Sequence, residues 1–104
     1  MQTIYLKKFG NVLVSRPAGL EAFNGIRPTL NKQDSIQINF DDVLAVTPSW
    51  FDEFLTNLGT FAEGDVVLLP TQNASVLAAL PVLMIGRQDK VAKIIQRFLD
   101  ENKK

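Results

Sequence analysis

The clearest periodic pattern in the chain is a strict alternation of apolar and polar residues in the segment SIQINF, residues 35–40. Alternation with a period of two is typical of a strand that buries one face. The polar residues Gln37 and Asn39 would then lie on the other face, which predicts a sheet with one face open to solvent. A weaker alternation over residues 4–7 predicts an earlier strand, and the Gly10-Asn11 step that follows it predicts a tight hairpin turn into residues 12–14.

Three other segments have the helical spacing of apolar residues, each after a residue suited to capping a helix. We expect helices from Pro17 to about residue 27, from Pro48 to about residue 58, and from residue 90 onward. The expected caps are Ser15, Thr47 and Asp89, and Gly59 is expected to close the second helix. Lys103 and Lys104 would suit the negative end of the last helix dipole.

The remaining apolar segments have no clear period. The run VVLL, residues 66–69, predicts a central strand buried on both faces. For residues 74–85 we prefer a short helix over 74–80, Pro81 as a breaker and a strand over 82–85, with a loop as the other interpretation. The resulting fold class is α/β, a mixed sheet of four to five strands with helices packed on one face, in a single domain that spans residues 1–104.

Composition restricts the possible chemistry. The 104 residues include no Cys and no His, so disulfides, thiolate nucleophiles, Cys-ligated zinc and imidazole bases are excluded. Eleven basic and eleven acidic side chains give a net charge of zero, which provides no field to attract nucleic acid or anionic lipid. We expect no cofactor, no nucleic-acid partner and no membrane association, and the lack of a secretory pattern at the N-terminus predicts a cytoplasmic location.

The start of the second expected helix carries the most distinctive side chains. Ser49 would occupy the second helical position, where a phosphate could interact with free backbone N–H groups and the positive end of the helix dipole. Trp50 falls at the edge of the apolar stripe of this helix, so we expect it to be partly exposed. It is then either an anchor for a partner protein or a cover for the rim of the core.

Four carboxylates flank this helix start in the sequence: Asp41, Asp42, Asp52 and Glu53. If the strand end and the helix start converge, they could supply oxygen ligands to magnesium or calcium. The same four charges would oppose a phosphate on Ser49. Their ordinary interpretation is that Asp ends strands and that acidic residues favour the first turns of helices.

A set of short motifs resembles the STAS-like domain family of unknown function, which is related to bacterial anti-sigma-factor antagonists. The matching residues are Gly10, Ser15-Arg16, Ile36 to Phe40, Asp41-Asp42-Val43, Ser49-Trp50-Phe51 and Asp52-Glu53. In the antagonists, a serine at the start of the second helix is phosphorylated by a partner kinase. Laid on this chain, that motif falls on Thr47, Pro48, Ser49 and Trp50, and only the acceptor serine matches.

The resemblance, together with the lack of common catalytic groups, predicts a non-enzymatic regulatory module that binds a protein. It implies a kinase-like ATPase or another signalling protein as partner and Ser49 as the phosphoacceptor. The expected partner-binding residues are Asp41, Asp42, Thr47, Trp50, Asp52 and Glu53. The alternatives are a metal-assisted hydrolase built on the four carboxylates and a purely self-associating module, and we expect a monomer or weak homo-oligomer.

Overall fold

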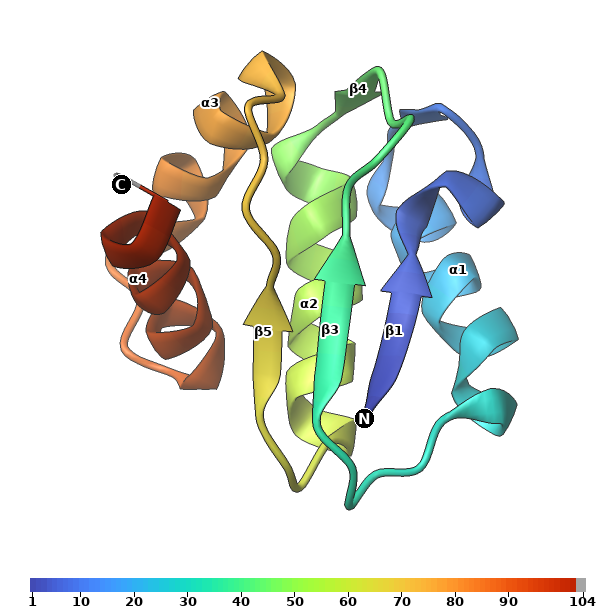
Figure 1. Ribbon diagram of the computed structural model, residues 1–104. Coiled ribbons are helices and arrows are strands. Elements are labelled where there is room, and N and C mark those ends of the chain that lie inside the picture. The colour runs from blue at the N-terminus through green and yellow to red at the C-terminus, as the bar shows by residue number, and fades with distance from the viewer. Residues whose placement is uncertain (103–104) are drawn as a thin grey trace.

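The computed structural model describes residues 1–102 and has an α/β fold with two small parallel sheets (Figure 1). Its strands are β1 (Gln2–Tyr5), β2 (Val12–Leu13), β3 (Ile36–Asn39), β4 (Ala45–Val46) and β5 (Val66–Leu68). Its α-helices are α1 (Arg16–Ile26), α2 (Pro48–Phe61), α3 (Ala74–Met84) and α4 (Lys90–Asn102). Two short 3-10 helices, η1 (Leu6–Phe9) and η2 (Arg27–Thr29), complete the described elements.

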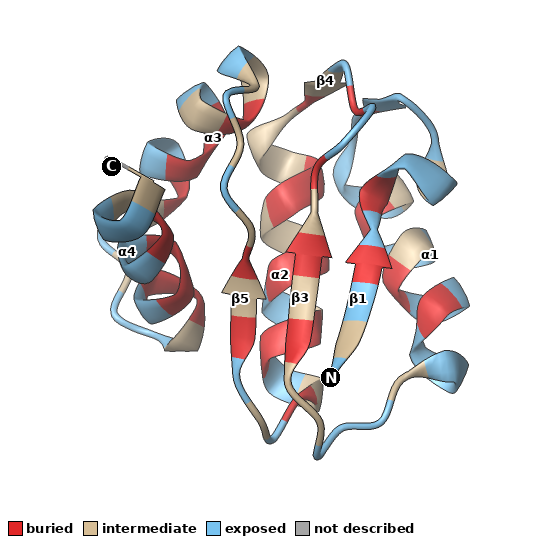
Figure 2. Ribbon diagram, in the orientation of Figure 1, coloured by how far each residue is buried: buried red, intermediate tan, exposed pale blue. Residues whose placement is uncertain are grey.

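The larger sheet has the strand order β1-β3-β5, and β2 pairs with β4 beyond its carboxyl end (Figure 1). Because the strands follow one another across the sheet, right-handed crossovers place both α1 and α2 on the same face. Figure 2 shows buried positions alternating with more exposed ones along the three strands. Ile36 and Ile38 are buried, whereas Gln37 and Asn39 are partly exposed, as the alternation in the sequence predicts.

The predicted hairpin at Gly10 is wrong, and so is the prediction of a mixed sheet. All three strand pairings are parallel, and residues 6–9 form η1 instead of extending the first strand. The physical reason is burial: Leu6 is fully buried and Phe9 packs against the core. Residues three apart share one side of a 3-10 helix, whereas in a strand they would point to opposite faces.

The predicted break at Pro81 and the predicted strand over residues 82–85 are also wrong, because α3 runs through Pro81 from residue 74 to residue 84. Val76, Ala79, Leu80 and Leu83 are buried, which is the spacing of one helical face. Pro81 lies on the exposed side of that helix, where the carbonyl it leaves without a partner can be hydrated. The run at 66–69 forms a strand over residues 66–68, but β5 is at the edge of the sheet instead of its centre, and Val67 is only partly buried.

The predicted helix caps are confirmed. Ser15 accepts a hydrogen bond from the N–H of Ala18, Thr47 from that of Trp50, and Asp89 from that of Ala92. The predicted end of α2 at Gly59 is wrong, since the helix continues to Phe61.

The helices α1 and α2 approach each other closely. A Cβ on Gly19 of α1 would lie 2.5 Å from the backbone oxygen of Trp50 on α2, so only glycine permits this approach. On the same side of α2, Trp50 stacks on Phe54 with ring centroids 4.9 Å apart, and Phe9 of η1 lies 6.2 Å from Trp50. The contacts of Trp50 with Gly19 and Phe9 fix the start of α2 against the N-terminal part of the chain.

Within residues 1–102, no helix combines the length and the apolar character needed to cross a bilayer. Lys103 and Lys104, which the sequence assigns to the end of the last helix, lie outside the described residues.

Candidate functional site

The start of α2 places Thr47 and Ser49 at the surface near the carboxyl end of the sheet. Both residues are half-buried, and their hydroxyl oxygens lie 3.4 Å apart. Thr47 also holds the end of β2, because its backbone N–H donates to the carbonyl of Leu13 at 2.9 Å. Ser49 is therefore the second residue of a capped helix of 14 residues, as the sequence predicts.

Trp50 does not lie at a partly exposed edge, and in this respect the prediction is wrong. Its side chain is 1% exposed and is covered by Phe9 of η1 and by the close approach of α1. The apolar stripe of α2 alone puts Trp50 at its margin, because the stripe does not reveal that η1 and α1 pack over that margin. A buried Trp50 cannot be a protruding anchor for a partner.

Asp52 and Glu53 are engaged by arginines of this chain. Nη1 of Arg16 lies 2.8 Å from Oδ2 of Asp52 and 3.4 Å from Oε1 of Glu53. Arg87, in the turn before α4, donates to the other oxygen of Asp52, and Thr56 donates to that oxygen at 3.2 Å. The two carboxylates thus join the starts of α1 and α2 to the turn between α3 and α4.

The ionisation of this cluster follows from its geometry. Partial burial raises the pKa of Asp52, but hydrogen bonds from Arg16 and Arg87 outweigh burial, and its pKa lies below the ordinary value of 3.8. The hydrogen bond to Asp52 in turn raises the pKa of Arg16. The cluster is therefore charged and internally compensated at neutral pH.

Asp41 and Asp42 occupy a separate part of the surface. Asp42 takes a left-handed backbone conformation with φ of 65° in the turn after β3, and its carboxylate lies 3.3 Å from Nζ of Lys7. Asp41 is exposed and makes no ion pair among residues 1–102. Among those residues, no three acidic side chains come close enough together to hold a metal ion. The convergence that the hydrolase alternative requires is not found.

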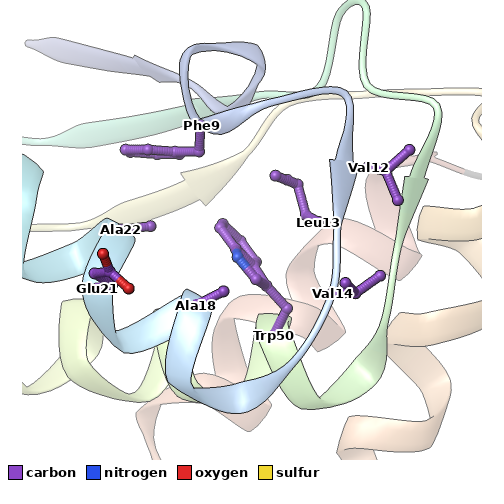
Figure 3. Close-up of a pocket in the computed structure, with 8 residues that line it drawn as sticks. All are labelled: Phe9, Val12, Leu13, Val14, Ala18, Glu21, Ala22 and Trp50. Carbon is purple, nitrogen blue, oxygen red and sulfur yellow. The ribbon is translucent and has the colours of Figure 1, made fainter.

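A pocket of about 430 Å³ opens beside the start of α2, and the sequence did not predict it (Figure 3). Phe9, Leu13, Val14, Ala18, Glu21 and Trp50 are among its lining residues, from η1, β2, α1 and α2. The sequence signal that could have indicated it is the apolar run of residues 12–14, which is longer than a strand of two residues needs. The predicted hairpin did not indicate a pocket, because it assigns residues 12–14 to an ordinary strand.

Two exposed aliphatic residues, Val12 and Val14, line this pocket, and a third, Leu44, directly precedes β4. Val12 is 54% exposed, Val14 47% and Leu44 67%. Val12 pairs with Ala45, the residue after Leu44, and Val14 follows the pair of Leu13 and Val46. These three residues, together with Thr47 and Ser49, are called the carboxyl-end face below.

Comparisons with known proteins identify no family for this chain: no family model, no curated protein and no solved structure matches it.

Proposed function

We propose that this protein is a non-enzymatic regulatory module that binds a protein partner through the carboxyl-end face. The observation that carries the proposal is the exposure of Val12, Val14 and Leu44 on and next to the paired strands β2 and β4. Grouped apolar side chains at a surface favour a protein interface. In open parallel α/β sheets, binding takes place at the carboxyl ends of the strands, where this face is located.

We further propose that phosphorylation of Ser49 controls binding. The carboxylates of Asp52 and Glu53 would oppose a phosphate on the preceding turn, but Arg16 compensates both and Arg87 compensates Asp52 again. A phosphate on Ser49 would lie at the positive end of the α2 dipole and would add close to two negative charges beside the aliphatic side chains. We expect the modification to release a partner held by apolar contacts. The resemblance to the STAS-like family suggests a kinase-like ATPase as that partner.

The test is affinity capture of the tagged protein from its source cell. Leu44→Asp places a charge in the carboxyl-end face and should abolish recovery of the partner. Ile85→Asp is the matched control, because Ile85 is 81% exposed but lies in the turn after α3, and it should recover the partner as the wild type does. If Leu44→Asp recovers the same proteins as Ile85→Asp, this face is not the binding site.

Intact-mass measurement and peptide mapping of the same material test the switch. We expect a fraction that carries phosphate on Ser49 and that contains no bound partner. Ser49→Ala should bind constitutively and Ser49→Glu should bind weakly. A partner that is retained equally by these two variants would contradict the control by phosphorylation while leaving the binding face in place.

A further inference from the structure

The pocket beside Trp50 contains a polar group that the described chain leaves without a partner. Trp50 is almost fully buried, yet the hydrogen bonds of residues 1–102 include none from its indole N–H. Every fully enclosed side-chain nitrogen or oxygen among those residues does have a partner. The indole N–H must therefore reach open space, and Figure 3 shows the nitrogen on the side of the ring that faces Glu21 and Ala22.

The wall of the pocket carries a second group without a partner, the carboxylate of Glu21. It is exposed and forms no ion pair or side-chain hydrogen bond within the described part of the chain. The other lining residues are apolar and include Phe9, Leu13 and Val14. The pocket thus combines mostly apolar side chains, one hydrogen-bond donor that reaches the open space and one negative charge.

We infer that this pocket receives a short segment of the protein partner in which an apolar residue is next to a lysine or arginine. The apolar side chain would pack between Phe9 and Val14, a carbonyl of the segment would accept from the indole N–H, and the basic group would pair with Glu21. A free N–H in the pocket favours a ligand that brings an acceptor, because a ligand that displaces the hydrating water without replacing its hydrogen bond loses affinity.

The size and the position of the pocket favour a protein segment as occupant. Its volume of about 430 Å³ is large enough for an apolar side chain with its neighbouring backbone. Val12 and Val14 line the pocket and also belong to the carboxyl-end face, so one partner can cover both without interruption. The inference therefore rests on the proposed function and specifies the chemistry of the partner.

The chain provides its own probe, because Trp50 is its only tryptophan. Three capped dipeptides separate the contributions: acetyl-Leu-Lys-amide has all the required groups, acetyl-Leu-Glu-amide reverses the charge, and acetyl-Ser-Lys-amide lacks the apolar side chain. Each is titrated to about 20 mM, a range suited to the weak affinity expected of so small a ligand. Binding is followed by Trp50 fluorescence and by the single indole N–H signal in a proton–nitrogen correlation spectrum.

We expect acetyl-Leu-Lys-amide to give saturable changes in both signals, with the indole proton moving downfield as it gains an acceptor. Acetyl-Leu-Glu-amide should bind about threefold more weakly, which is the size of effect expected for one exposed charge pair. Acetyl-Ser-Lys-amide should give no saturable change. In Glu21→Gln, which alters only an exposed side chain, the two leucine peptides should bind equally.

Absence of a saturable change with acetyl-Leu-Lys-amide would overturn the inference, and so would equal binding of the Lys and Glu peptides to the wild type. These failures are distinguishable from failure of the proposed function. If Leu44→Asp loses the partner but no dipeptide binds, the carboxyl-end face stands and the pocket does not. If the dipeptide binds but Leu44→Asp keeps the partner, the pocket site stands without that face.

Discussion

The two sides of the first turns of α2 differ in how completely their polar groups are satisfied. On one side, Asp52 and Glu53 are held by Arg16 and Arg87, and every charge has a partner within the chain. On the other side, the Trp50 indole and Glu21 face a pocket and have no partner among residues 1–102. An unpaired carboxylate and a free indole N–H at one pocket can both bind a ligand, so we expect an external ligand on this side.

The largest expected effect comes from Gly19→Ala, which disturbs both sides at once. Its Cβ would lie 2.5 Å from the Trp50 backbone oxygen, so α1 must move away from α2. We expect a loss of about 3 kcal/mol in the free energy of unfolding, measured by urea denaturation.

Gly25→Ala is the matched control for this variant. Gly25 is in the same helix with nothing within 4 Å of its added Cβ, and replacing it should stabilise the protein by about 0.5–1 kcal/mol. Equal effects of the two substitutions would show that α1 does not approach α2 as closely as described.

Next in size is Asp52→Asn, which affects only the satisfied side. It leaves Arg16 and Arg87 without their shared charged acceptor, and we expect a loss of about 2 kcal/mol in urea denaturation. Asp41→Asn removes an exposed carboxylate with no ion pair among residues 1–102, and it should change stability by less than about 0.5 kcal/mol. Similar losses of stability in Asp52→Asn and Asp41→Asn would mean that the ion pairs of the arginines with Asp52 do not stabilise the fold.

A smaller effect is expected from acid. The pKa of Asp52 is lower in the folded state than its ordinary value of 3.8, so its stabilisation is present in full above that value. It is lost as the pH falls through the lower, folded pKa. The free energies of unfolding of the wild type and Asp52→Asn should therefore differ at pH 7. This difference should shrink progressively as the pH is lowered below 3.8. A constant difference over that range would contradict the assigned ionisation.

The smallest expected change in stability is that of Glu21→Gln on the unsatisfied side. Because Glu21 has no partner within the described chain, its thermal midpoint should stay within about 1–2 °C of the wild type. A large destabilisation would show that Glu21 has a structural role, and the contrast between the two sides of α2 would then be lost.

Local signals in the sequence predicted much of the fold correctly. The caps Ser15, Thr47 and Asp89 and the alternation around Ile36 depend on neighbours within a few residues, and the structure confirms them. The hairpin at Gly10 was wrong because the turn residue indicates only a change of direction. It does not reveal that Leu6 and Phe9 must enter the same core.

The candidate site was less predictable, because its properties depend on contacts between distant segments. The sequence identified the start of α2, but the burial of Trp50 depends on α1 and η1 packing over it. The pairing of Asp52 depends on Arg16 and Arg87, which lie 36 and 35 residues away. No periodicity within α2 contains either contact, so both contacts could be found only in three dimensions.

The parallel pairing of all the strands has a consequence for how the chain folds. β1 pairs with β3 and β3 with β5, so each pairing joins segments about thirty residues apart and must wait for the intervening helix. Within residues 1–102, no local hairpin is available to start the sheet. We therefore expect α1 and α2 to associate first, through the approach at Gly19, and Gly19→Ala to slow refolding as well as to lower stability. Gly19 would then determine both the rate of folding and the packing of α1 over Trp50.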